Sequence, residues 1–205
     1  MLYYNAIRSQ TLELLKTLQE KEAFQSLRLV GGTALALQIG HRFSDDLDLF
    51  GVLDMGRNDV SAVLSSFFNV VHIGGSKNIH IYAINNIKVD FVNYAYPWLR
   101  PSLEIDGLRL AAIEDIAAMK MAAITGRGTK KDFIDIYYLL KRYSLPELLS
   151  FYQKKYHDGS LFLVLRSLVY FDDADNDPLP NIFSPLAWSE VKEEIRKNVL
   201  RFTEK

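Results

Sequence analysis

The chain has 205 residues, 49% of them hydrophobic, and a formal net charge of −1. This charge excludes a global attraction to nucleic acid, so such a partner would have to bind a local basic patch. The absence of cysteine excludes disulfides, thiol catalysis and cysteine-ligated zinc. The N-terminus has no signal-peptide pattern, and no apolar run approaches the about 20 residues that span a bilayer. We expect a cytoplasmic protein that contacts no membrane.

The N-terminal part of the chain predicts alternating helices and strands. Leu12, Leu15 and Leu18 recur at helical spacing within residues 5–24, whereas residues 27–30 form a short apolar run typical of a strand. A helix over residues 33–38 ends near Gly40, because glycine favours helix C-termini. A strand with carboxylates is predicted over residues 44–50, and a helix over residues 56–68 with Asn58 as its N-cap.

The strongest strand signals lie between residues 70 and 95. Apolar runs at 70–73, 79–84 and 87–94 are separated by turn-forming residues at 74–76 and 85–86. We therefore expect a meander of antiparallel strands.

Helical patterns dominate the remainder of the chain. A brief segment at 107–110 precedes predicted helices at 115–124, 130–142, 146–156, 161–170 and 189–202. An acidic, proline-containing loop is predicted at 172–185. This change in character predicts two domains, residues 1–112 and 113–205.

Three carboxylates lie in predicted apolar strands. Because side chains alternate along a strand, Asp46 and Asp48 face one side and Leu47 and Leu49 the other. Neighbouring carboxylates repel each other unless a cation lies between them, and oxygen ligands of this kind suit Mg²⁺. Asp90 lies in a later apolar strand, where an unpaired charge is costly. Three carboxylates converging on a sheet suit two-metal phosphoryl or nucleotidyl transfer.

A glycine pair precedes this carboxylate strand. Backbone without a Cβ atom can approach a phosphate closely, so Gly31 and Gly32 together with the carboxylates predict a site for a nucleoside triphosphate. The alternative for Asp46 and Asp48 is a solvated strand end.

The same residues resemble a known family. The runs GGTAL at 31–35, GHRFS at 40–44 and DLDLF at 46–50, followed by Asp90, are similar to the DNA polymerase-β-like nucleotidyltransferase superfamily. The nearer match is its AbiEii/AbiGii toxin-like branch. A second set supports that branch in the right order and spacing: EDI at 114–116, Lys120, Arg127, KD at 131–132 and DIY at 135–137. The resemblance covers roughly residues 27 to 140.

The resemblance implies an α+β fold, in which helices flank a mixed sheet. Residues 1–112 would form the nucleotidyltransferase domain, and the helical residues 113–205 would complete the active cleft. It also implies a two-metal Mg²⁺ site in which Asp46 and Asp48 bind both ions. Asp90 would complete the coordination of the ion that activates the acceptor hydroxyl. With Lys120, these three carboxylates form the implied catalytic set.

The resemblance also implies residues that bind the nucleotide. Lys120 would face the triphosphate and neutralise charge on the departing pyrophosphate. The full implied set is Gly31, Gly32, Thr33, Ser44, Lys120, Arg127, Lys131, Asp132 and Asp135. For part of this set a structural alternative is open: Asp132 suits the first turn of a helix, and Asp135 could pair with Lys131 at i, i+4 spacing.

The implied activity is Mg²⁺-dependent transfer of a nucleoside monophosphate from an NTP to a hydroxyl. The acceptor would be a tRNA 3′ end or a protein side chain, and the chain would be the toxin of a toxin–antitoxin or phage-defence pair with a separate antitoxin protein. Two alternatives are open: a transferase acting on an aminoglycoside-like small molecule, and a non-catalytic nucleotide-binding module.

Overall fold

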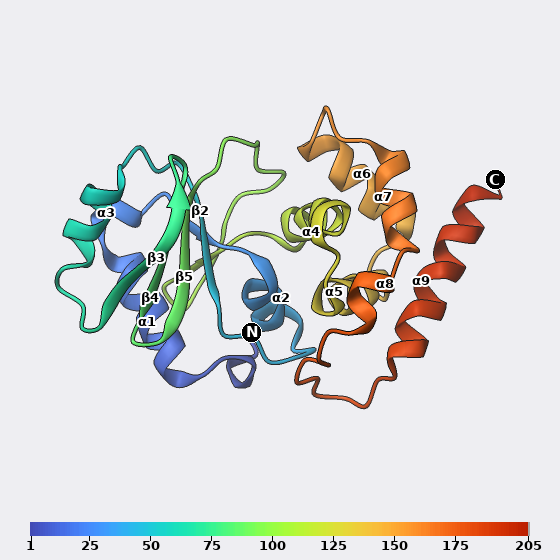
Figure 1. Ribbon diagram of the computed structural model, residues 1–205, viewed down its shortest axis with the longest axis horizontal. Helices are drawn as coiled ribbons and strands as arrows, with labels where there is room; N and C mark the ends of the chain where they lie inside the picture. Colours follow the sequence, from blue (N-terminus) through green and yellow to red (C-terminus); the bar gives the residue numbers. More distant parts are fainter. Residues whose placement is uncertain (205) are drawn as a thin grey trace. The chain divides into compact units, whose positions relative to one another are not determined.

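The computed structural model describes residues 1–204 (Figure 1). The chain forms two compact units. Unit 1 comprises Met1–Gly40, Ser44–Tyr96 and Pro101–Ala111. Unit 2 comprises His41–Phe43, Pro97–Arg100 and the chain from Ala112 onward. Two short segments of the N-terminal half therefore belong to the second unit.

Unit 1 contains a seven-stranded sheet with the order β3-β4-β5-β2-β1-β7-β6. The pairs β2–β5 and β1–β7 are parallel and the other neighbours are antiparallel, so the sheet is mixed, as expected. The strands are β1 (Arg28–Leu29), β2 (Leu47–Gly51), β3 (Val70–Ser76), β4 (Ile79–Ile84), β5 (Ile87–Asn93), β6 (Leu103–Ile105) and β7 (Leu108–Leu110).

The helices of unit 1 are η1 (Tyr4–Ala6), α1 (Ser9–Glu20), η2 (Glu22–Phe24), α2 (Gly31–Ile39) and α3 (Arg57–Leu64). Burial follows the predicted alternation, since Leu47, Leu49, Val89 and Phe91 are all fully buried. Their burial directs the intervening side chains of β2 and β5 to the opposite face of the sheet.

Two strand predictions were wrong in their limits. The strand predicted to start at residue 44 starts at Leu47, because the preceding backbone bonds elsewhere: the Ser44 N–H donates to Ala6 O at 2.9 Å. The predicted turn at 74–76 is part of β3, which has a bulge between His72 and Gly74. The turn at Asn85 and Asn86 is confirmed, and both residues have positive φ.

Helix starts also differ from the sequence-based limits. Helix α2 begins at Gly31, so the glycine pair lies in its first turn instead of ahead of it. Helix α3 is capped at Gly56, whose N–H donates to the Asp59 carboxylate at 2.9 Å, and not by Asn58. A carboxylate at this position satisfies a backbone N–H that has no partner within the helix.

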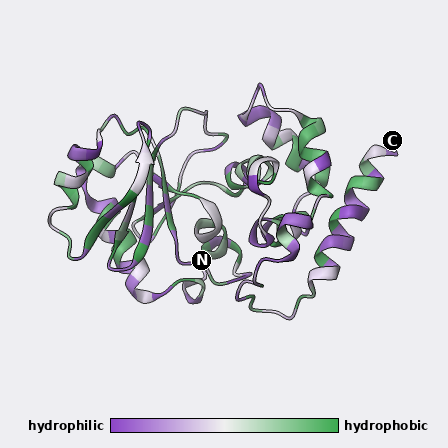
Figure 2. Cartoon of the chain, viewed as in Figure 1, coloured by the Kyte–Doolittle hydropathy of each residue, from purple (hydrophilic) through white to green (hydrophobic). Residues whose placement is uncertain are grey.

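Unit 2 is helical. Its helices are α4 (Ile113–Arg127), α5 (Lys130–Leu140), α6 (Leu145–Lys155), α7 (Leu161–Leu168), α8 (Asp172–Asp175) and α9 (Trp188–Thr203). Helix α9 alternates between polar and apolar residues (Figure 2), and it buries Val191, Ile195 and Val199. Within residues 1–204, every helix is too short or too polar for a membrane span.

The Pro97–Arg100 segment is held in unit 2 by a buried ion pair. The Asp115 carboxylate accepts hydrogen bonds from the N–H groups of Leu99 and Arg100 at 2.9 and 3.1 Å. Lys155 Nζ lies 2.7 Å from Asp115 and donates to the Pro97 carbonyl at 2.8 Å. Both charged side chains are fully buried, so each depends on the other for neutralisation.

Replacing Asp115 by Ala should lower the free energy of unfolding of unit 2 by about 3–5 kcal/mol, because Lys155 would be left buried without its counter-ion. Both tryptophans, Trp98 and Trp188, belong to unit 2, so urea denaturation followed by tryptophan fluorescence reports on this unit. Glu114→Ala is the control, since its partner Arg100 is mostly exposed, and it should cost less than about 1 kcal/mol. Equal losses in the two variants would contradict the role of the buried pair.

Candidate functional site

Two carboxylates lie side by side in the sheet of unit 1. In the parallel pairing of β2 with β5, Asp48 is the register partner of Asp90. Their neighbours Leu47, Leu49 and Val89 are buried on one face, so both carboxylates point to the other. The Asp90 side chain is 18% exposed, which leaves it accessible to a small ion.

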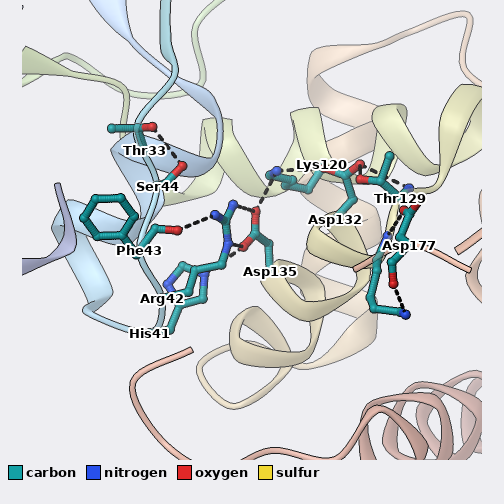
Figure 3. A network of polar contacts seen from close by, with 11 residues as sticks. Thr33, His41, Arg42, Phe43, Ser44, Lys120, Thr129, Asp132, Asp135 and Asp177 are labelled. Atoms are coloured by element: carbon teal, nitrogen blue, oxygen red, sulfur yellow. Dashed lines mark hydrogen bonds and ion pairs between the residues drawn. The ribbon is translucent and has the colours of Figure 1, made fainter. Parts of the chain in front are cut away.

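Asp46 is exposed and lies directly ahead of β2. The buried Thr33 hydroxyl donates to the Asp46 carbonyl at 2.5 Å. It also lies 2.9 Å from Ser44 Oγ (Figure 3). Thr33, on α2, thus fixes the segment that leads into β2. The predicted contacts of Thr33 and Ser44 with a nucleotide stay predictions.

Gly31 brings the start of α2 against the Asp48 carboxylate. Its φ is 69°, a left-handed conformation, and a Cβ atom at this position would overlap Asp48 Oδ2. Gly32 follows in the same first turn, and no side chain caps this helix N-terminus. The first N–H groups of a helix have no acceptor within it and attract anions. This arrangement suits a phosphate bound beside Asp48.

The chemistry of this donor set fits Mg²⁺, because Asp48 and Asp90 supply hard oxygen ligands next to a glycine backbone. Over residues 1–204, no three side chains of His, Cys, Asp or Glu are arranged to hold a metal ion. A pair of carboxylates is nevertheless sufficient for Mg²⁺, which usually takes one or two of them and completes its shell with water and substrate phosphates.

One residue at this site was not singled out from the sequence. Lys88 Nζ lies 2.6 Å from each carboxylate oxygen of Asp90, and its side chain is 44% exposed. The signal was present in the spacing, because residues two apart in a strand share a face.

Unit 2 contains a buried cluster of charges centred on Asp135 (Figure 3). Arg42 contacts this carboxylate through Nε at 2.7 Å and through Nη2 at 3.0 Å. Lys120 Nζ lies 2.6 Å from Asp135 and 2.8 Å from Asp132, and His41 Nε2 lies 2.7 Å from Asp135. The predicted residues Lys120, Asp132 and Asp135 therefore come together, with His41 and Arg42 added to them.

The charges in this cluster stabilise one another. Burial alone would raise the pKa of Asp135, but Arg42 and Lys120 hold it well below its usual range. Burial alone would lower the pKa of Lys120, but Asp135 and Asp132 raise it. Burial lowers the pKa of His41 despite its hydrogen bond to Asp135. His41 is therefore neutral near pH 7, and its Nε2–H donates to the ionised Asp135.

The remaining predicted residues lie near the junction of α4 and α5. Arg127 and Lys131 are exposed. Asp132 accepts from the Thr129 N–H at 3.3 Å, which agrees with the structural alternative of a carboxylate in the first turn of a helix. Lys130 is buried, and its N–H donates to Asp177 of the acidic loop at 2.9 Å.

The acidic loop also holds the His41–Phe43 segment within unit 2. The Phe43 N–H donates to the Asn181 carbonyl at 2.8 Å, and the Phe183 N–H donates to the His41 carbonyl at 3.1 Å. Together with the Arg42–Asp135 ion pair, these bonds fix both the backbone and the side chains of the segment.

Comparison with known proteins is decisive for the family. The family described as "Nucleotidyl transferase AbiEii toxin, Type IV TA system" matches residues 13–203. The chain belongs to this family. It is a nucleotidyltransferase of the AbiEii type, as its resemblance implied. An uncharacterized protein of Aquifex aeolicus (strain VF5) is 37% identical over 182 residues, which cover 86% of this chain and 87% of the relative.

Solved structures confirm the expected α+β fold of this AbiEii nucleotidyltransferase, with a mixed sheet and flanking helices. MenT4, a nucleotidyltransferase toxin of Mycobacterium tuberculosis H37Rv, is similar with a TM-score of 0.64 and 18% identity, covering 95% of this chain and 81% of that one. JHP933 of Helicobacter pylori is similar with a TM-score of 0.60 and 22% identity, covering 97% and 94%.

Replacing Gly31 by Ala should lower the free energy of unfolding by about 1–3 kcal/mol, because alanine is strained at positive φ and its Cβ would displace Asp48. Thermal denaturation followed by circular dichroism measures the loss. Gly74→Ala is the control in the same unit, since a Cβ there meets no atom within 4 Å. The close approach of Gly31 to Asp48 would be refuted by equal stabilities.

The lowered pKa of His41 predicts a dependence of unit 2 stability on pH. Below about pH 6.5 the unfolded chain binds a proton at His41 that the folded chain does not, so the free energy of unfolding falls as the pH falls. His41→Gln keeps a donor for Asp135 but does not titrate. Between pH 6.5 and 5 its stability should decrease less steeply than that of the wild type, by up to about 1.4 kcal/mol per pH unit.

Urea denaturation at several pH values, followed by tryptophan fluorescence, measures this slope. His157→Gln, an exposed histidine of the same unit, should keep the slope of the wild type. If His41→Gln also kept it, the proposed neutral state of His41 would be wrong.

Proposed function

We propose that this AbiEii-type nucleotidyltransferase transfers a nucleoside monophosphate from an NTP to an acceptor hydroxyl, with Mg²⁺ bound at the sheet of unit 1. The observation that carries the proposal is the pairing of Asp48 with Asp90 beside the Gly31 end of α2. This arrangement combines a carboxylate pair for a cation with a helix N-terminus for a phosphate.

The NTP would bind through its phosphates at the start of α2. Backbone N–H groups of Gly31 and Gly32 would donate to phosphate oxygens, which the positive end of the helix dipole attracts. Ser44 would add a hydroxyl from the segment that Thr33 fixes. The absence of a Cβ atom at Gly31 allows the phosphate to reach the neighbourhood of Asp48.

Asp48 and Asp90 would hold the Mg²⁺. Asp46 is not grouped with them in this structure, so its side chain would have to turn toward the pair to serve as a further ligand. When bound, Mg²⁺ would lower the pKa of the acceptor hydroxyl and neutralise charge on the departing pyrophosphate. Asp90, at the β5 side of the pair, would orient the acceptor hydroxyl. Asp48, next to Gly31, would orient the NTP for displacement in line with the leaving group.

For the residues of unit 2 we propose a division of roles. Lys120 of α4 forms ion pairs with Asp132 and Asp135 of α5 and is only 7% exposed. We propose that these side chains hold α4 and α5 in register, in place of the contact of Lys120 with the triphosphate that the resemblance implied. The exposed Arg127 and Lys131 would contact phosphates of the nucleotide or of an RNA acceptor.

We further propose a tRNA 3′ end as the acceptor and a toxin role, with a separate antitoxin as partner. Two things support this: the family is described as a toxin of type IV toxin–antitoxin systems, and unit 2 carries exposed cations at Arg127 and Lys131. A protein side chain is the other acceptor that the assay below detects.

The test is a labelling assay. The purified protein is incubated with Mg²⁺, each α-³²P-labelled NTP in turn, total RNA and cell protein. Asp48→Asn should reduce label transfer at least about 100-fold, because the carboxylate pair loses half of its charge. Asp54→Asn, which removes one exposed carboxylate from unit 1, should transfer label at the wild-type rate. EDTA should abolish transfer.

Each outcome separates the alternatives. Label on tRNA supports the proposed acceptor, whereas label on a protein band assigns a protein hydroxyl instead. Binding of an NTP without label on any macromolecule would favour a small-molecule acceptor or a non-catalytic module. Equal transfer by Asp48→Asn and Asp54→Asn would show that Asp48 is not part of the catalytic site.

A further inference from the structure

Lys88 and Asp90 are two residues apart on β5, and both side chains lie on the face of the sheet that carries Asp48. The Lys88 ammonium is equidistant from the two Asp90 oxygens, at 2.6 Å from each. It therefore occupies a position from which a cation contacts both oxygens of the carboxylate.

We propose that Lys88 is a displaceable counter-cation of Asp90, and that it sets the concentration of divalent cation at which the site fills. This inference rests on the proposed function, since it takes Asp48 and Asp90 as the metal ligands. Lys88 is a positioning residue in this account, because it acts through Asp90.

Electrostatics make the ammonium and the metal ion competitors. A divalent cation bound to Asp90 would lie within a few ångströms of the ammonium, and like charges at that distance repel. Without any cation, the adjacent carboxylates of Asp48 and Asp90 would repel each other instead. Lys88 therefore stabilises the metal-free sheet and opposes metal binding with the same charge.

The exposure of Lys88 keeps this competition mild. Its side chain is 44% exposed, so the flexible stem can swing the ammonium into water when a metal ion arrives. A partly exposed ion pair is weak, so Lys88 raises the metal concentration needed for binding but does not prevent binding. Removal of Lys88 should therefore tighten metal binding by about threefold to tenfold.

A solely structural lysine would behave differently. Its removal would destabilise the fold with and without metal and would leave metal affinity unchanged or weaker. A lysine that contacts substrate phosphate would slow transfer but would not tighten metal binding. The direction of the change in metal affinity thus distinguishes the proposed role from both.

The experiment measures binding of Mn²⁺, used as a probe for the Mg²⁺ site, to the full chain by electron paramagnetic resonance of the free ion. Lys88→Met should bind Mn²⁺ about threefold to tenfold more tightly than the wild type. Lys88→Arg keeps the charge and should bind like the wild type. Lys77→Met removes an exposed lysine from the turn between β3 and β4, and it controls for the general loss of one positive charge.

Asp90→Asn, alone and combined with Lys88→Met, separates the two levels of the argument. If Asp90→Asn leaves Mn²⁺ binding intact, the metal site of the proposed function is wrong and the inference falls with it. If Asp90→Asn weakens binding but Lys88→Met binds no more tightly than Lys77→Met, the metal site stands and the role of Lys88 is refuted. Thermal denaturation adds a second readout: Mn²⁺ should raise the melting temperature of Lys88→Met more than that of the wild type.

Discussion

The parallel pairing of β2 with β5 is the constraint on which the proposed chemistry of unit 1 depends. It places Asp48 opposite Asp90, and it does so only because Leu47, Leu49, Val89 and Phe91 are buried on the other face. A slip of one residue would turn every side chain of the strand over. The apolar residues that stabilise the sheet therefore also fix the carboxylate pair.

Charge is handled differently in the two units. In unit 1 the Asp48–Asp90 pair is partly exposed, and Lys88 compensates the charge of Asp90 from the same strand. In unit 2 Asp135 is fully buried and contacts Arg42, Lys120 and His41. Partly exposed charges can exchange partners with a ligand, whereas a buried cluster with matched charges resists change. This contrast suits ligand binding at the first site and a structural role for the second.

Local patterns were enough to predict much of unit 1. Three features could be predicted because each depends only on residues next to one another in the sequence. They are the glycine pair, the alternation around Asp48 and the Asn85–Asn86 turn. The contact of Arg42 with Asp135 joins residues 93 positions apart, and no periodic pattern in the sequence predicts it. Gly74 and Gly75 misled the prediction because glycine favours both turns and bulges, and only strand pairing decides between them.

The division of the chain has a consequence for genetics. His41–Phe43 and Pro97–Arg100 belong to unit 2 although residues of unit 1 flank them in the sequence. A gene fragment that stops at Ala111 would keep Arg42 but lose Asp135, and it would keep Leu99 but lose Asp115. Neither unit is thus encoded as one continuous piece, so recombination at a single breakpoint cannot exchange one unit for a homologous unit. Point substitutions, and not truncations, are the sound way to dissect this enzyme.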